Sequence, residues 1–215
     1  MPPNRPRPMP SRTEVAPSSR PRPRAADEAR TTLTPQHWIA EATAVLVDSG
    51  IDTVRVDVLA KRLGVTRGSF YWHFKDRDDL LSHVLDAWRN AATEQLIERF
   101  EHRTSDPHAL LKELISLPFR GRSAQQAARI ELAIRGWARR DATARQAVDD
   151  VDARRISYIA QCFSALGFDI AEARHRGFLL YAYEVAESML SNQGTPAQKT
   201  QRSTLMERLL LMREV

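Results

Sequence analysis

Residues 66–77, TRGSFYWHFKDR, concentrate side chains that suit contact with nucleic acid. The planar guanidinium of Arg67 can donate two hydrogen bonds to O6 and N7 of guanine, and the Ser69 hydroxyl can reach a base edge or a phosphate. Gly68 lets the backbone approach closely, and Trp72 can contact a thymine methyl or the sugar wall. We therefore expect Arg67, Gly68, Ser69 and Trp72 to contact DNA bases.

Patterns typical of enzymes are missing from the sequence. It contains no G-x-x-x-x-G-K, H-E-x-x-H, C-x-x-C or G-x-S-x-G segment, and its six histidines show no ligand spacing with cysteines or carboxylates. Asp149, Asp150 and Asp152 spread around a solvated helix face rather than forming a catalytic pair. We expect no enzymatic activity, no metal and no cofactor.

Two short helices joined by a tight turn must position residues 66–77. Leu59 and Leu63 belong to the apolar face of the first helix, predicted over 56–63, and Gly64 ends it by tolerating positive φ. Thr66 is placed to cap a second helix that begins at Arg67. Helix, turn and helix in this order predict a helix-turn-helix, whose second helix enters the major groove.

The second helix, over 67–74, carries more aromatic surface than one side of a short helix can bury. Phe70 and Phe74, four residues apart, are predicted to face the core. The other aromatic side chains, Tyr71, Trp72 and His73, are then left for a partner.

The run LGVTRGSFYWHFKDRDDLL resembles the signature of TetR-family transcriptional regulators. Gly64, Tyr71, His73, Phe74 and Leu80-Leu81 stand where the pattern of that family expects them. The resemblance implies an all-α fold, with a three-helix DNA-binding domain joined by a linker helix to a helical ligand-binding and dimerisation domain.

Five residues are expected to contact DNA phosphate, four of them from the family resemblance: Thr66, Tyr71, His73, Lys75 and Arg77. Packing against the first helix is the alternative for Tyr71 and His73. Asp57 fits least well, because an acid near a phosphate should repel it. Its alternative role is to stabilise the start of its own helix through the helix dipole.

The composition indicates a helical protein without a membrane span. Of the 215 residues only 8 are glycine, and no run of about eighteen apolar residues occurs. The amino terminus lacks the apolar segment of a signal peptide, so we expect a cytoplasmic protein. Cys162 lies in an apolar helical pattern and is predicted to be a core side chain, with redox sensing as the alternative.

Positive charge gathers in two regions of a chain whose net charge is +5. Residues 1–30 hold seven arginines against three acidic residues, and residues 54–77 hold six basic residues against two. We predict that residues 1–30 form a disordered Pro/Arg-rich tail. The tail either lies along DNA as a basic arm or is inert.

Apolar periodicity and capping residues predict helices nearly throughout the rest of the chain. We expect a DNA-binding domain over 31–78 and a regulatory and dimerisation domain over 79–215. Beyond the helix pair, helices are expected over 35–49, from about 80 to 100, from 107 to about 117, through 130–137, and over 141–166, 169–190 and 196–212, with a loop at 121–126.

The last two helices are expected to form the interface of a homodimer, because one recognition helix reads too few bases alone. The residues assigned to this interface are Phe178, Tyr181, Val185, Met189, Leu205 and Leu209. An ordinary monomer core is the alternative.

The resemblance also implies an effector pocket in the second domain. Its candidate lining is aromatic with two charged contacts, which favours an apolar or planar organic ligand: Trp88, Phe119, Glu131, Arg135, Trp137, Tyr158 and Phe163. The alternative for each of these residues is that it packs in the hydrophobic core and does not contact a ligand.

The sequence thus predicts a repressor that a small molecule releases from a palindromic DNA operator. The alternatives are a helical ligand-binding or enzymatic body with a vestigial DNA-binding head, and a nonspecific DNA-coating protein. The sequence does not identify the operator, the effector or the regulated genes, and it does not decide between repression and activation.

Overall fold

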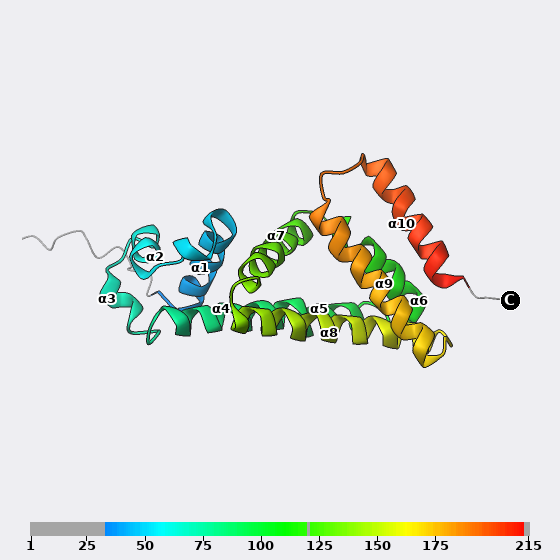
Figure 1. Ribbon diagram of the computed structural model, residues 1–215, viewed down its shortest axis with the longest axis horizontal. Coiled ribbons are helices and arrows are strands. Elements are labelled where there is room, and N and C mark those ends of the chain that lie inside the picture. Colours follow the sequence, from blue (N-terminus) through cyan, green and yellow to red (C-terminus); the bar gives the residue numbers. More distant parts are fainter. Residues whose placement is uncertain (1–32, 120, 213–215) are drawn as a thin grey trace, which may run out of the picture. The chain divides into compact units, whose positions relative to one another are not determined.

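The structure of the protein is a computed structural model, which describes residues 33–119 and 121–212 (Figure 1). The regular structure within these residues is helical. No strand occurs within these residues, so the predicted all-α class is confirmed. None of the described helices is long and apolar enough to cross a membrane. The predicted tail, residues 1–30, lies outside the described residues.

The amino-terminal helices form a small bundle, which we call the head: α1 (Pro35–Ser49), η1 (Ile51–Thr53), α2 (Val56–Arg62) and α3 (Arg67–Phe70). α1 begins at the predicted Thr34-Pro35 and ends at Gly50, whose φ is +81°. The next helix, α4 (Arg77–Ala92), starts in the head and runs out of it (Figure 1). Asp76 caps α4, since its carboxylate accepts a hydrogen bond of 2.9 Å from the Asp79 amide.

The remaining helices form a second group, which we call the body. They are α5 (Glu94–Glu101), α6 (Pro107–Ser116), η2 (Leu117–Phe119), α7 (Gly121–Ala138), α8 (Ala142–Ala165), α9 (Ile170–Met189) and α10 (Pro196–Leu211). α8 and α9 approach very closely at Gly177, where a Cβ atom would lie 3.0 Å from the Ala160 nitrogen. A glycine at this position therefore permits the contact between the two longest helices.

After the head, two predicted boundaries differ from the structure. The helix expected to continue to about Phe100 breaks at Thr93, whose φ and ψ are −121° and −86°, so that α4 and α5 are separate helices. Residues 121–126, expected as a loop, form the first turns of α7. Gly121 and Ser123 suggested a loop, but the alanine- and glutamine-rich sequence that follows is compatible with a helix.

Two clusters of buried side chains hold these helices together. The first joins the head, through Trp38 and Phe70, to α4 and to parts of α7 and α8 such as Trp137 and Val148. The second joins α5, α6 and the later part of α8 to α9 and α10. Because α4 contributes side chains such as Trp88 to the first cluster, tight packing continues past residue 78.

Candidate DNA-binding interface and effector cavity

The turn between α2 and α3 sets the direction of the second helix. Gly64 adopts a φ of +68°, as the sequence predicts, and the Val65 amide donates a 3.0 Å hydrogen bond to the Ala60 carbonyl. Thr66 occupies the capping position of α3, but its side chain makes no capping hydrogen bond. The Thr66 hydroxyl therefore makes no hydrogen bond that caps α3.

Phe70 and Phe74 anchor this segment in the core of the head, as predicted. Phe70 is fully buried and Phe74 nearly so, and the Phe70 ring meets the edge of Trp38 with 5.3 Å between ring centroids. The α-helix itself ends at Phe70, earlier than the predicted Phe74, and the chain continues as a turn over 71–73. The anchored rings fix which side chains point outward.

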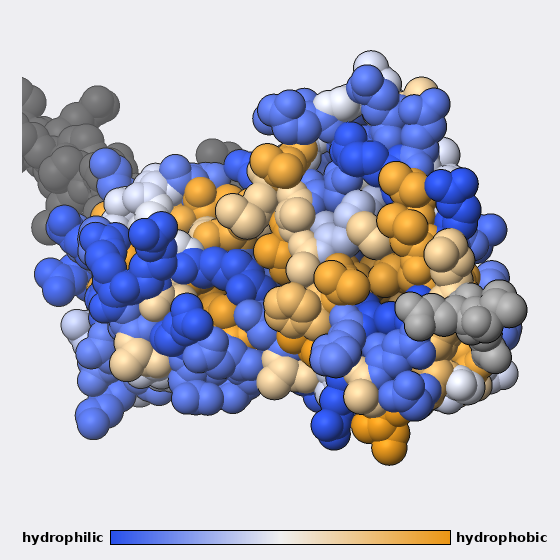
Figure 2. All heavy atoms as spheres, turned by 45° about the vertical axis from the view of Figure 1, so that its right-hand side comes forward, coloured by the Kyte–Doolittle hydropathy of each residue, from blue (hydrophilic) through white to orange (hydrophobic). Residues whose placement is uncertain are grey.

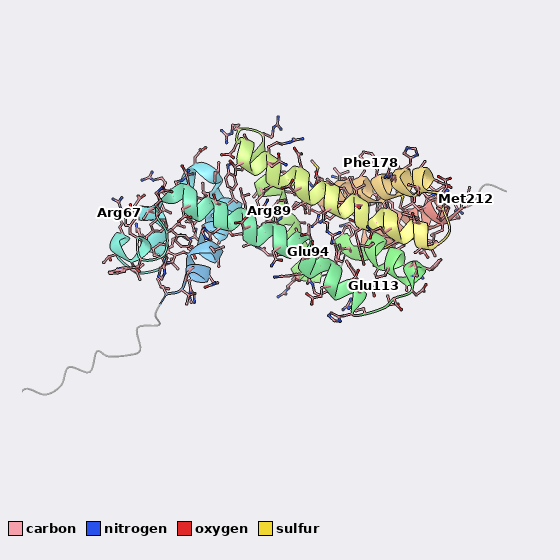
Figure 3. All side chains as sticks on the ribbon, turned by 90° about the horizontal axis from the view of Figure 1, so that it is seen from below. Arg67, Arg89, Glu94, Glu113, Phe178 and Met212 are labelled. Carbon is pink, nitrogen blue, oxygen red and sulfur yellow. The ribbon has the colours of Figure 1, made fainter. Side chains whose placement is uncertain are left out.

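The residues predicted to read bases lie on the outer surface of the head. Trp72 is 87% exposed, Arg67 and Gly68 are exposed, and Ser69 is half-buried. Arg67 lies at the outer end of the head (Figure 3). A large apolar ring exposed to this degree is costly in water and suits a surface that meets a partner.

The residues predicted to contact phosphate surround the same surface, with one exception. Tyr71 is 56% exposed, Lys75 is exposed and His73 is half-buried. Arg77 instead donates from Nε to the Val54 carbonyl at 2.6 Å and from Nη2 to the Ile51 carbonyl at 2.8 Å. We therefore assign to Arg77 the role of holding the loop before α2 against the start of α4.

Asp57 forms a bidentate ion pair with Arg55 at the start of α2. Arg55 donates from Nε at 3.1 Å and from Nη2 at 2.8 Å. The hydrogen bond from Arg55 lowers the pKa of the Asp57 carboxyl, and the charge of Arg67 acts in the same direction. The acid that fits poorly beside DNA is thus paired with a cation of its own helix start.

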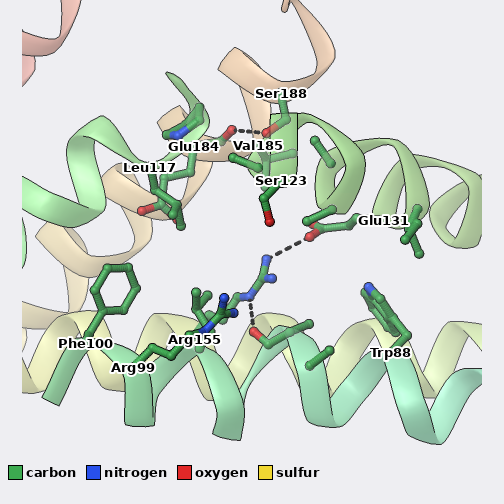
Figure 4. A pocket seen from close by; sticks show the side chains of 18 of the residues that line it. Trp88, Arg99, Phe100, Leu117, Ser123, Glu131, Arg155, Glu184, Val185 and Ser188 are labelled. Carbon is green, nitrogen blue, oxygen red and sulfur yellow. Dashed lines mark hydrogen bonds and ion pairs between the residues drawn. The ribbon is translucent and has the colours of Figure 1, made fainter. Parts of the chain in front are cut away.

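The body contains a cavity of about 820 Å³ between α4, α5, α7, α8 and α9 (Figure 4). Most of its wall is apolar and includes Trp88, Phe100 and several alanines. Charged side chains reach it from α5 and from three further helices, with Glu131 on α7, Arg155 on α8 and Glu184 on α9. A cavity of this volume is large enough for a drug-sized organic molecule.

Only part of the predicted pocket lining borders this cavity. Trp88 and Glu131 line it, and Tyr158 lines a smaller adjoining cavity. Trp137 and Phe163 are instead buried in the two core clusters. The side chain of Phe119 lies outside what the structure describes. Arg135 is tied into an ion-pair network beside the cavity.

That network of ion pairs and hydrogen bonds links α7, α8 and α9, and some of its members also line the cavity. Arg135 pairs with Glu131 at 2.9 Å and with Asp152 at 2.5 Å, and it donates to the Tyr181 hydroxyl at 2.9 Å. Arg155 donates to the second Glu131 oxygen at 2.8 Å. The two guanidinium groups are therefore balanced by the two carboxylates.

Glu184 differs from these carboxylates because its carboxyl group has an oxygen without a hydrogen-bond partner among the described residues. The residue is 8% exposed, and its Oε1 is buried without a hydrogen-bond partner among the described residues. Burial raises the pKa of the Glu184 carboxyl to about 8, although the charge of Arg155 opposes this shift. Sequence reasoning missed both Arg155 and Glu184. An acid within the apolar run around Tyr181 and Val185 was the available signal.

The predicted dimer-interface residues separate into two groups. Phe178, Met189, Leu205 and Leu209 are 58%, 63%, 45% and 50% exposed. Tyr181 is instead buried in its own chain, where its hydroxyl donates to Asp152 at 2.6 Å, and Val185 lines the cavity. Helical spacing places Tyr181 and Val185 on the side of α9 that faces α7 and α8.

The exposed apolar side chains of α9 and α10 form a surface that we call the α9–α10 surface: Phe178, Leu179, Met189, Leu190, Leu205, Leu209 and Met212. Figure 2, which turns this side of the body forward, shows apolar side chains gathered there. Phe178 projects outward from α9 (Figure 3). Exposed apolar surface of this kind is typical of a protein–protein interface.

No group of histidine, cysteine, aspartate and glutamate side chains within residues 33–119 and 121–212 is arranged to hold a metal ion. Cys162 is buried, as the sequence predicts, and burial raises the pKa of its thiol to about 11.

An all-α chain whose second and third helices form this turn is a helix-turn-helix protein. Residues 39–84 match the sequence profile described as "Bacterial regulatory proteins, tetR family". The resemblance predicted from the sequence is therefore confirmed, and the helix-turn-helix domain of this chain is a tetR-family domain.

Known proteins resemble this chain in two ways. The HTH-type transcriptional regulator AcrR of Shigella flexneri is 33% identical over 82 residues, which span 38% of each chain. A transcriptional regulator from Rhodococcus sp. Rha1 is similar in structure with a TM-score of 0.65 and 21% identity, over 83% of this chain and 96% of that one. FadR from Bacillus subtilis, crystallised with stearoyl-CoA, gives a TM-score of 0.60 and 20% identity, over 83% and 98%.

The curated sequence match spans well under half of this chain and well under half of AcrR. The structural matches cover most of the described chain, and at this identity they establish the fold of the body.

Proposed function

We propose that this chain is a homodimeric transcriptional regulator that binds a palindromic DNA operator and represses transcription until a small molecule occupies its cavity. One observation carries the proposal. A single helix, α4, begins at Arg77 directly after the exposed segment of the head and ends at Ala92 in the wall of the cavity. A ligand that changes the end of α4 therefore acts on the element that holds the head.

In this proposal the head, residues 31–78, reads DNA with Arg67, Ser69 and Trp72, and the backbone at Gly68 lies against the bases. Thr66, Tyr71, His73 and Lys75 contact phosphate. Their exposure around the anchored Phe70 and Phe74 supports this division of roles. The exposed Lys75 supplies the sequence-independent part of the affinity, and Arg67 supplies base discrimination.

The body, residues 79–215, binds the effector and joins two copies of the chain through the α9–α10 surface. Two copies place two recognition segments on two half-sites, which gives the specificity that one segment lacks. FadR of Bacillus subtilis was crystallised with stearoyl-CoA, so a protein of this fold accommodates a small molecule. The cavity of about 820 Å³ supports the same capacity here.

A vestigial head was the alternative function, and Asp57 was its only support. The bidentate pair with Arg55 balances that charge within the protein, so no observation now favours the alternative.

A gel-shift experiment with the purified chain tests the proposal. The probes are the promoter DNA that flanks its own gene and random DNA of equal length, each at two salt concentrations. We expect a shift of the promoter DNA that survives at the higher salt while the random DNA is released. Equal binding of the two DNAs, or no binding, would overturn the proposal.

A further inference from the structure

One acidic side chain of the cavity wall has a carboxyl oxygen without a hydrogen-bond partner among the described residues, although the charge of Arg155 acts on that carboxyl. Glu184 lines both the large cavity and the smaller one beside it. Its Oε1 is buried and accepts no hydrogen bond from the described residues. A buried carboxyl oxygen without a partner costs free energy, which a ligand that supplies a donor recovers.

The cation nearest to Glu184 in charge interactions, Arg155, donates its hydrogen bonds to other groups. Arg155 donates from Nη1 to Glu131 at 2.8 Å and from Nε to the Ala92 carbonyl at 2.8 Å. Glu131 in turn pairs with Arg135, and Arg135 pairs with Asp152, so this network is balanced without Glu184. Figure 4 shows the Arg155 side chain joined to Glu131, and its guanidinium also lies 5.8 Å from the ring centroid of Tyr181 on α9.

Other titratable side chains reach the cavity from α5 and from the segment after it. These are Arg99, His102 and Arg103, all exposed to solvent, and Arg103 lies 3.6 Å from Glu113. Water and salt screen exposed charges, whereas a charge placed beside the buried Glu184 interacts in a medium of lower dielectric constant. A charged group of a ligand beside Glu184 therefore interacts more strongly with its carboxyl than with these exposed side chains.

The surroundings of Glu184 suit an amphiphilic molecule. Tyr158, whose hydroxyl is also buried without a partner, lines the smaller cavity with Glu184. The rings of Trp88 and Phe100 and several alanines also belong to the wall of the large cavity (Figure 4). Aromatic faces attract organic cations, and the alanines leave room for an apolar body.

We infer that the cavity binds an apolar molecule carrying a protonated amine, and that the Glu184 carboxylate receives the N–H groups of that amine. This inference rests on the proposed function, in which the same cavity is the effector site. At neutral pH the free carboxyl holds its proton. Binding of an ammonium group then releases that proton to solvent, and the bound pair consists of one carboxylate and one ammonium.

Three probes with the same tail and different head groups test this assignment: decylamine, decanol and decanoate, each below its critical micelle concentration. Titration calorimetry on the full chain without DNA gives their affinities. We expect decylamine to bind at least about tenfold more tightly than either of the others. Its affinity should rise from about pH 6 to about pH 8, with proton release detected as a dependence of the heat on the buffer.

The Glu184→Gln variant keeps the shape of the side chain and removes its charge. It should lose the preference for decylamine over decanol and the dependence on pH. Glu94→Gln, at an exposed acid outside the cavity wall, should retain both. Equal affinities of the three probes for the wild-type chain, or an unchanged preference in Glu184→Gln, would overturn the assignment even where the variant is less stable.

Gel shifts of the promoter DNA in the presence of each probe separate this inference from the proposed function. If decylamine binds through Glu184 but leaves promoter binding unchanged, the ligand class stands and the regulatory role fails. If decanoate, and not decylamine, releases the promoter DNA, the regulatory role stands and the ligand class is wrong.

Discussion

The guanidinium of Arg155, on α8, donates a hydrogen bond of 2.8 Å from Nε to the main-chain oxygen of Ala92, the last residue of α4. Carbonyl groups at the end of a helix lack partners within the helix, so Arg155 supplies a donor where α4 stops. The same side chain lines the cavity and pairs with Glu131. One side chain therefore connects the contents of the cavity to the end of the helix that leaves the head.

Replacing Arg155 by methionine removes both of these interactions. We expect the free energy of unfolding to fall by about 3 kcal/mol, because the buried Glu131 loses one of its two cations. Urea denaturation followed by circular dichroism measures the change. Arg154→Met is the matched control, since Arg154 pairs with the exposed Glu94 and should cost less than about 1 kcal/mol. Similar losses in the two variants would contradict the role assigned to Arg155.

The free energy of unfolding should also depend on pH through Glu184. Its pKa in the folded chain, about 8, lies above the ordinary value of 4.5, so the folded state binds an additional proton between these values. The stability due to this group is fully present below about pH 4 and is lost as the pH rises through about 8. Glu184→Gln should therefore gain stability relative to the wild type between about pH 5 and about pH 8.

Urea denaturation at several pH values in this window measures that difference. A constant difference between the Glu184→Gln variant and the wild type would show that the folded carboxyl is ionised throughout.

Truncation of two aromatic side chains of the DNA-binding segment, Trp72 and Phe70, should affect different properties: DNA binding for Trp72 and stability for Phe70. Trp72→Ala should change the free energy of unfolding by less than about 0.5 kcal/mol, since the ring is 87% exposed, but should weaken binding to the promoter DNA. Phe70→Ala should cost about 3–5 kcal/mol, because that ring is fully buried. Thermal melts and DNA titrations of the two variants provide the measurements, and unchanged DNA binding in Trp72→Ala would remove that residue from the interface.

The α9–α10 surface should control the oligomeric state. Phe178→Glu places a charge on an apolar side chain that is 58% exposed and should convert the dimer to a monomer at micromolar concentration. Trp72→Glu, at an exposed ring on the head, should leave the dimer intact. Light scattering after size exclusion distinguishes these states, and a monomeric wild-type chain would exclude dimerisation through this surface.

Local sequence predicted most helix boundaries because the capping residues make local contacts. Pro35 begins α1 as expected, and Gly64 adopts the positive φ predicted for the residue that ends the helix before the turn. The break at Thr93 was missed, since no glycine or proline marks it. A donor from α8, distant in the sequence, meets the end of α4 there.

The two candidate sites differed in how far the sequence could define them. The DNA-binding surface is built within one short segment, so the spacing of Phe70 and Phe74 was enough to tell buried from exposed side chains. The cavity lies between five helices, and periodicity does not specify which helices meet. Trp137 and Phe163 were therefore assigned to a pocket that they do not line, and Glu184 was missed.

Base reading by α3 is the central claim, and one comparison of two variants tests it most directly. Fluorescence anisotropy would measure the binding of Arg67→Ala and Lys75→Ala to the promoter DNA and to random DNA of equal length. We predict that Arg67→Ala loses about 1–3 kcal/mol on the promoter DNA and little on random DNA, whereas Lys75→Ala weakens both alike. Equal losses of Arg67→Ala on the two DNAs would contradict the claim.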